Sequence, residues 1–405
     1  MQLISLAGLF LLVFIAYLLS NNRKNIKWRG IATGILLQLV FGVIILKSDI
    51  GAAIFQGARE LFTATLSFSD RGASFIFGGL SDREKIGFSF ATMVLPTIIF
   101  FSSVMSVLYH LGVMQILVRA VAWVMVKVMG TSGAESLAAA ANIFAGQTEA
   151  PLVVRPYIAS MTKSELMALM TGGMATVAGG VLAAYVGMGI DAGHLLAASV
   201  MSAPAALVCA KLLIPGSEEP ITRGDVKLDL PKGSVNIIDA AATGAADGLK
   251  LAFNVAAMLM AFIAIIALLN AALSWMGGLF DAPQLSLELI CGYLFAPFAF
   301  ILGVPWSDIF AVGTLLGKKL ILNEFVAYLD LQQMVKAGEL SPRSVTIATY
   351  ALCGFANFSS VAIQVGGIGS LVPERREDFA RLGFSCLVGG TLACLMTAAV
   401  AGMLI

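Results

Sequence analysis

The sequence predicts an all-α integral membrane protein with about eight transmembrane helices and two re-entrant helical hairpins, built as an inverted repeat with scaffold and transport domains. The chain has 405 residues, of which 59% are hydrophobic and only 12% are charged. Its mean hydropathy of +0.92 is far above that of soluble domains. Apolar runs of about 20 residues recur along the chain, without the alternation that marks barrel strands.

Net charge and cysteine spacing argue against a nucleic-acid-binding protein and against a protein held together by disulfides or metal sites. The net charge is +1 and no basic patch is present, so nucleic acid is not an expected partner. The five cysteines lie inside apolar segments without CxxC spacing, so we expect small core residues rather than disulfides or metal ligands.

Apolar runs and the charges between them predict the N-terminal spans and their orientation. An apolar run from Leu3 to Leu19 lacks a basic residue before it and a cleavage site after it, so we expect a span and not a removable signal peptide. The next loop, 21–29, has four basic residues and no acidic one, which predicts a cytoplasmic loop and an N-terminus outside. A second span covers Ile31 to Leu46, and the amphipathic stretch Asp49 to Phe68 predicts an interfacial helix.

A first hairpin is predicted after the third span. That span runs from Ile86 to Tyr109, following a charged connection at 81–85, and the segment Val113 to Met129 is either a tilted span or an interfacial helix. Between Gly133 and Met161 a polar stretch is flanked by two apolar pieces, each too short to span: Ser136–Phe144 and Leu152–Ile158. Such a pair is typical of a re-entrant hairpin whose tip lines a cavity inside the protein.

The middle of the chain contains three more spans. Two are expected at Glu165–Met188 and His194–Ile214, before the longest hydrophilic connection, Pro215 to Lys232. A second interfacial helix is expected at Ser234–Asp247, and a span at Leu249–Met276.

The C-terminal part predicts the second hairpin. The segment Leu285–Phe310 is interrupted at Pro297, Gly303 and Pro305, and Gly313–Tyr328 carries a polar tip. A span at Val345–Leu371, a loop with three arginines at 373–381 and a last span at Gly383–Leu404 follow. The charge rule then places the C-terminus outside.

An internal repeat points to transport. The run Gly173–Gly180 follows the first hairpin and the similar run Gly354–Ser360 follows the second, and the hairpin tips contain Thr148-Glu149 and Asn323-Glu324. Counting spans gives the two units opposite orientations, which is the signature of a secondary transporter. Costly glycines within spans, Gly179-Gly180 and Gly366-Gly367, indicate either unwound or closely approached backbone that could face a ligand, or small residues that allow close helix packing. We expect a scaffold at 1–132 and 234–284, and a transport domain at 133–233 and 285–405.

The hairpin tip Gly146–Pro151, the segment Leu322–Phe325 and the run Gly354–Ser360 resemble those of the concentrative nucleoside transporters. The resemblance covers essentially the whole chain. It implies a homotrimer in the inner (plasma) membrane, in which a transport domain moves like an elevator against a scaffold.

The resemblance also implies a division of the substrate site. Gln147, Thr148 and Glu149 would face the nucleobase, and Glu324, Asn357 and Ser360 the ribose, while the apolar lining would comprise Val181, Leu251 and Phe355. This agrees with the chemistry, because a carboxylate and a carboxamide can accept from neighbouring hydroxyls and an aromatic ring can pack on a base.

A coupling-ion site is implied as well, formed by Asn142, Thr176 and the backbone carbonyls of Ala145 and Val177. Oxygen ligands suit a hard cation, so sodium is the expected coupling ion and the expected substrate is a nucleoside such as uridine. Proton-coupled symport is the alternative. A membrane enzyme using Glu149 and Glu324 as an acid/base pair is disfavoured because no nucleophile, metal triad or cofactor motif accompanies them. A receptor would not need the duplicated broken helices.

Overall fold

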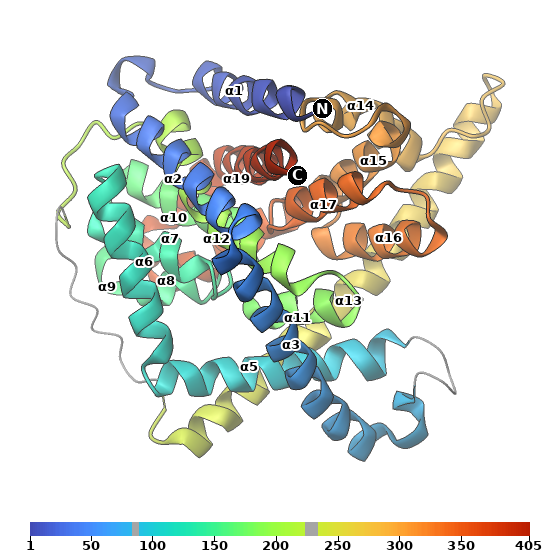
Figure 1. Cartoon of the computed structure of the whole chain (residues 1–405), viewed down its shortest axis with the longest axis horizontal. Coiled ribbons are helices and arrows are strands. Elements are labelled where there is room, and N and C mark those ends of the chain that lie inside the picture. Colours follow the sequence, from blue (N-terminus) through green and yellow to red (C-terminus); the bar gives the residue numbers. More distant parts are fainter. Residues whose placement is uncertain (83–88, 223–233) are drawn as a thin grey trace.

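A computed structural model describes residues 1–82, 89–222 and 234–405, and all regular structure in these residues is helical (Figure 1). Parts of two sequence predictions lie outside the described residues. The first is the end of the charged connection together with the first residues of the predicted third span. The second is most of the hydrophilic segment that precedes Ser234.

The helices of the N-terminal half are α1 (Gln2–Leu18), α2 (Trp28–Lys47), α3 (Asp49–Phe77), α5 (Leu95–His110), α6 (Val113–Met129), α7 (Gly133–Asn142), α8 (Ala150–Val153), α9 (Arg155–Ile158), α10 (Lys163–Ala175), α11 (Gly179–Gly187) and α12 (Ala192–Leu213). A π-helical turn, Phe90–Val94, leads into α5. The helices of the C-terminal half are α13 (Ile237–Gly278), α14 (Leu287–Ile301), α15 (Ile309–Ile321), α16 (Glu324–Ala337), α17 (Pro342–Leu352), α18 (Phe358–Leu371) and α19 (Arg376–Leu404).

Six helical stretches of the described residues are long and apolar enough to cross a membrane, judged by length and composition. They are Trp28–Lys47, Phe90–His110, Lys163–Gly187, Ala192–Leu213, Ile237–Gly278 and Pro373–Leu404. Shorter apolar helices are α1, α14 and α18. The sequence-based number of about eight spans therefore stays a prediction.

Two of the predicted continuous spans are broken in the middle, which corrects the sequence-based boundaries. The first is interrupted between α10 and α11, and the second between α17 and α18. The two breaks contact each other, because the backbone N–H of Phe355 donates to the carbonyl of Thr176 at 3.2 Å. Hydropathy did not reveal the breaks because most of their residues, such as Val177, Ala178 and Phe355, are apolar.

The predicted glycine pairs have different roles. Gly179 and Gly180 open α11 directly after the first break. Gly366 and Gly367 lie inside the regular helix α18, so the backbone there is not unwound. A Cβ on Gly367 would lie 3.4 Å from the methyl carbon of Thr148, which is an ordinary close packing contact.

One continuous helix replaces the predicted interfacial helix and span at 234–276. The helix α13 has 42 residues and crosses the whole view of Figure 1 obliquely. It stays helical past Asp247 because Gly244 and Gly248 let it pack directly on α5, where a Cβ would lie within 3 Å of Ser102 and of the adjoining backbone.

The second pair of short helices also differs from the prediction. Pro297 lies within α14 without ending it, so the predicted break there is wrong. The helix ends instead before Gly303, whose φ of +82° favours glycine. The two short helices that meet at a polar tip are α15 and α16, joined through Leu322 and Asn323, and α14 packs against α15.

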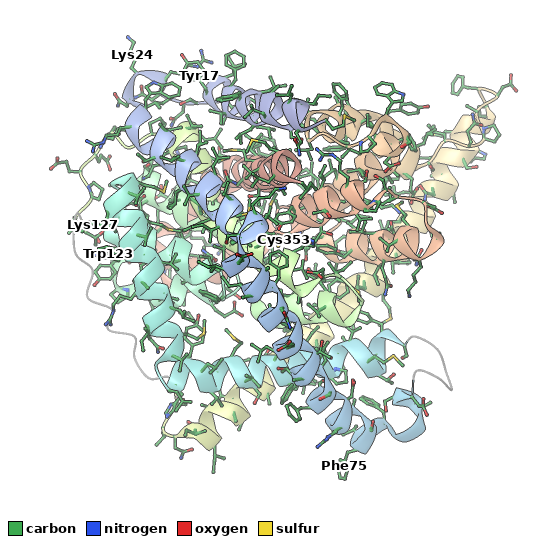
Figure 2. All side chains as sticks on the ribbon, in the orientation of Figure 1. Tyr17, Lys24, Phe75, Trp123, Lys127 and Cys353 are labelled. Atoms are coloured by element: carbon green, nitrogen blue, oxygen red, sulfur yellow. The ribbon has the colours of Figure 1, made fainter. Side chains whose placement is uncertain are left out.

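Among the described stretches long enough to cross a membrane, those with α10, α12 and α19 are the most buried, and α2 and α17 pack around them. Cys353 lies near the middle of the molecule, whereas Trp123 and Phe75 point outward at its edges (Figure 2). All five cysteines are buried and free, which agrees with the expectation of small core residues. Large apolar side chains exposed at the periphery suit contact with lipid tails.

Candidate functional site

The polar stretch between α7 and α8 forms a tight loop. The backbone N–H groups of Glu149 and Ala150 both donate to the carbonyl of Gly146, at 3.1 and 3.0 Å. The Glu149 side chain lies close over Gly146, because a Cβ there would lie 2.3 Å from Oε2 of Glu149. A bond from the N–H of Gly179 to the carbonyl of Phe144, 3.0 Å long, joins this loop to the start of α11. The first tip and the first helix break are therefore held together.

The second half of the site is a buried carboxylate with two donors. Glu324 is 5% exposed and begins α16, directly after Asn323, whose side chain caps the helix. Oε1 of Glu324 accepts from the hydroxyl of Tyr185 and Oε2 from Nδ2 of Asn357, each at 2.9 Å. Asn357 in turn caps α18 by accepting from the N–H of Ser360. The contacts hold the carboxylate rigidly while its remaining lone pairs stay available.

Both halves face one cavity of about 910 Å³. Its lining includes all nine residues that the resemblance implied for the substrate: Gln147, Thr148, Glu149, Val181, Leu251, Glu324, Phe355, Asn357 and Ser360. Gln147 and Ser360 contact each other directly, through Nε2 and Oγ at 3.1 Å. Residues far apart in the sequence thus meet at one place, and the volume suits a small organic molecule.

Sequence reasoning missed several residues of this cavity. Asp247 and Asn254 of α13 line it together with Leu251, and Tyr109 of α5 adds a hydroxyl. Their spacing of four and three residues places them on one face of a helix, and that pattern could have identified them. Tyr185 was missed because a lone tyrosine in an apolar run gives no signal of its partner.

The implied ion residues lie at the ends of α7 and α10. Asn142 is buried, and its Nδ2 donates to the carbonyl of Ala138, while its Oδ1 has no hydrogen-bond partner. Thr176 follows α10 and is also buried, as are Ala145 and Val177. A Cβ on Gly172 would lie 3.0 Å from Nδ2 of Asn142, so the two helix ends are adjacent. The unpaired, buried Oδ1 of Asn142 is suited to bind a cation, because a buried oxygen without any partner costs free energy of folding.

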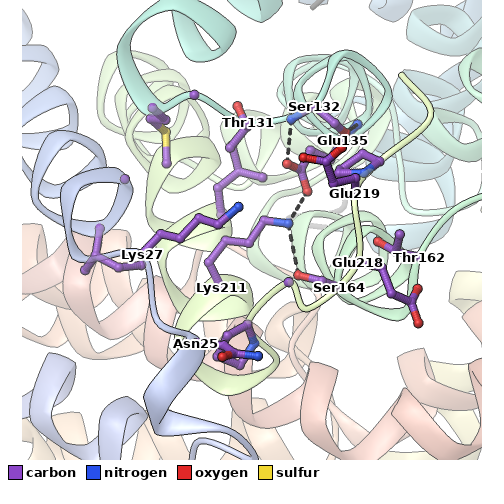
Figure 3. A pocket seen from close by; sticks show the side chains of 18 residues that line it. Asn25, Lys27, Thr131, Ser132, Glu135, Thr162, Ser164, Lys211, Glu218 and Glu219 are labelled. Atoms are coloured by element: carbon purple, nitrogen blue, oxygen red, sulfur yellow. Dashed lines mark hydrogen bonds and ion pairs between the residues drawn. The ribbon is translucent and has the colours of Figure 1, made fainter. Parts of the chain in front are cut away.

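A second, smaller cavity of about 110 Å³ contains a charged cluster (Figure 3). Lys211 of α12 pairs with Glu135 of α7 and donates to Ser164, and the hydroxyl of Ser132 donates to Glu165 at 2.6 Å. Each glutamate also caps the helix that contains it, in a capping box with Ser132 or Thr162. These charges satisfy one another, so the cluster joins α7, α10 and α12 and gives no evidence of a ligand.

Comparison with known families decides the class of protein. The family model described as "Na+ dependent nucleoside transporter C-terminus" matches residues 194–402. The corresponding N-terminal model matches residues 7–80, and a model described as "Nucleoside recognition" matches residues 91–192. The chain belongs to the Na+ dependent, or concentrative, nucleoside transporter family. This confirms the resemblance and supports sodium as the coupling ion.

The alignments with related proteins extend over essentially all of this chain. An uncharacterized transporter of Bacillus subtilis, YutK, is 48% identical over 99% of this chain and 98% of its own length. Solute carrier family 28 member 3 of rat is 46% identical over 100% of this chain, and the match covers 59% of the rat protein. Sodium/nucleoside cotransporter 1 of mouse is 45% identical, with 64% of its length matched. The chain thus spans about three fifths of these mammalian relatives.

Solved structures of another transporter, CNTnw, match this fold closely. Its inward-facing, substrate-bound state has a TM-score of 0.95 and 46% identity, with 100% of this chain and 98% of that chain covered. An outward-facing state of a CNTnw variant has a TM-score of 0.94 and 45% identity, with 100% and 97% covered. Because the two scores are nearly equal, overall similarity assigns no conformational state to this chain.

Proposed function

We propose that this transporter is a sodium-driven nucleoside symporter of the inner (plasma) membrane, which imports nucleosides such as uridine by an elevator-type alternating-access movement. The observation that carries the proposal is the large cavity between the tip loop of α7–α8 and the start of α16, where polar residues of both tips converge with Asn357 of the second helix break. Membrane transporters bind substrate at such interfaces between discontinuous helices.

The geometry supports separate contacts for ribose and base. Nδ2 of Asn357 donates to Oε2 of Glu324 at 2.9 Å, so the carboxylate keeps further lone pairs that can accept from ribose hydroxyls, and the second N–H of Asn357 can donate to a ribose oxygen. Gln147 and Thr148 would contact the edge of the base, because a carboxamide presents both a donor and an acceptor. Phe355 and Val181 would supply the apolar surface for the base, since both line the same cavity.

Sodium would bind at Asn142 and Thr176, with the backbone carbonyls of Ala145 and Val177. The unpaired Oδ1 of Asn142 supports this assignment, and neutral oxygen ligands need no proton transfer. The loop that starts at Asn142 also contains Gln147 to Glu149. Sodium binding would therefore order the base-contacting tip and raise nucleoside affinity, and the coupling would be reciprocal.

The membrane arrangement is part of the same proposal. We infer that α7–α9 and α15–α16 are the re-entrant hairpins of two inverted units, and that both termini lie outside. The scaffold would comprise 1–132 and 234–284, and the transport domain 133–233 and 285–405, assembled as a homotrimer. At the proposed boundary α11 packs closely on α5, since a Cβ on Gly180 would lie 3.1 Å from Oγ of Ser102.

Uptake of labelled uridine into proteoliposomes tests the function. We expect accumulation with an inward sodium gradient and none when choline replaces sodium. Accumulation that follows a proton gradient in choline would favour the proton-coupled alternative, and conversion of uridine to a product would favour an enzyme. Glu324→Gln should abolish uptake because it places an amide N–H₂ where an acceptor is needed. Glu339→Gln, an exposed glutamate after α16, is the matched control and should transport normally.

A further inference from the structure

A second buried carboxamide, that of Gln364, contacts the base side of the cavity from behind. It lies on α18 one turn after Ser360, is 0% exposed and does not line the cavity. We propose that Gln364 is a positioning residue that fixes the orientation of the Gln147 carboxamide, and thereby the donor and acceptor pattern that the transporter presents to the base. This inference rests on the proposed contact between Gln147 and the base.

Three hydrogen bonds form a chain from the backbone to the cavity. Nε2 of Gln364 donates to the carbonyl of Met170 and to Oε1 of Gln147, both at 3.1 Å. Nε2 of Gln147 then donates to Oγ of Ser360, also at 3.1 Å. Gln364 is fully buried and lies outside the cavity, so water does not compete for the two bonds that it donates.

The direction of this chain follows from its first member. The carbonyl of Met170 can only accept, so Gln364 must turn its N–H₂ group toward it. The second hydrogen of that group then requires an acceptor, which is Oε1 of Gln147. A flipped Gln147 would bring two N–H₂ groups together and lose a bond. The backbone of α10 thus determines which end of Gln147 faces Ser360.

The fixed orientation has a consequence for the substrate. Gln147 keeps one free N–H and one free lone pair, which can pair with an acceptor and a donor on a base. Ser360 has accepted from Gln147, so its hydroxyl hydrogen is left to donate. The free N–H and the free lone pair of Gln147 suit a base edge that has a carbonyl beside a ring N–H, as in uracil.

Packing and burial show that Gln364 is more than a space-filling residue. Its Oε1 has no hydrogen-bond partner, so the side chain buries an unpaired acceptor that an apolar residue would avoid. Gly173 of α10 leaves the room for the contact. A Cβ there would lie 2.8 Å from Nε2 of Gln364 and 3.0 Å from Cβ of Gln147.

Binding measurements on Gln364→Met in saturating sodium test the inference. We expect uridine affinity to fall about tenfold, the effect of one buried hydrogen bond, while analogues that lack O4 or N3–H lose much less. The preference for uridine over 2′-deoxyuridine and the sodium affinity should not change, because Glu324 and Asn142 are untouched. A purely structural defect would weaken all ligands equally.

Controls separate this inference from the proposed function. Gln38→Met removes another fully buried carboxamide, one that donates to Thr397 and has an unpaired Oε1, so binding should stay unchanged. If Gln147→Ala abolishes discrimination among the base analogues but Gln364→Met does not, the positioning role is refuted. If Gln147→Ala leaves discrimination intact, the base contact itself is refuted. Gly173→Ala, which crowds both amides, should reproduce the loss if Gln364→Met does not fold.

Discussion

Removal of one hydroxyl group, in Tyr185→Phe, should weaken nucleoside binding without changing the shape of the protein. The hydroxyl of Tyr185 donates to Oε1 of Glu324 at 2.9 Å, and both side chains are buried. Hydrogen bonds to charged groups contribute about 1.5–3 kcal/mol, which corresponds to a roughly 10- to 150-fold change in Kd if the ligand needs the oriented carboxylate. The phenylalanine ring keeps the contacts with Phe325 and Tyr328, so no cavity forms.

Calorimetric titration of purified protein with uridine in saturating sodium measures this effect. The matched control is Tyr328→Phe, since Tyr328 is equally buried and its ring centroid lies 4.4 Å from that of Tyr185. Its hydroxyl donates to the carbonyl of Thr349 rather than to the carboxylate. The reasoning is refuted if Tyr185→Phe binds uridine within twofold of the unmodified protein, or if Tyr328→Phe weakens binding as much.

Two predictions concern stability. The pKa of Asp308, which lies outside the membrane-crossing stretches, would be raised by burial, but hydrogen bonds from Ser344, Ser307 and Ser341 lower it from 3.8 to about 2. The ionised Asp308 carboxylate therefore stabilises the folded protein above pH 3.8, and this stabilisation is lost as the pH falls toward 2. The difference in Tm between the unmodified protein and Asp308→Asn should shrink below about pH 4. A difference in Tm that stays constant with pH would contradict this. Arg375 donates to the carbonyls of Ile158, Ala159 and Met161 at the end of α9, so Arg375→Ala should lower the Tm by on the order of 5 °C. Arg381→Ala removes only an exposed pair with Glu377 and should leave the Tm unchanged; equal losses would refute a special role for Arg375.

The sequence predicted the helix class and most helix positions, and the nine residues that it implied for the substrate line one cavity, while their roles stay predictions. Polar residues such as Gln147 and Glu324 stand out because they interrupt apolar runs, where a polar group without a partner is expensive. The errors have two causes. Hydropathy averages over a window, so it did not detect the mostly apolar break before Asn357. The break expected at Pro297 rested on the tendency of proline to end helices, and α14 passes through that residue.

Sequence alone determined that the chain crosses membranes, that it repeats a polar tip followed by a glycine-rich span, and to which family it belongs. Only the tertiary structure decided that Tyr185 supports Glu324, that Gln364 contacts Gln147, and that the carbonyl of Thr176 accepts from Phe355. These partners lie more than a hundred residues apart. Their pairing depends on how each helix is rotated about its axis and where it breaks, and packing against other helices determines both.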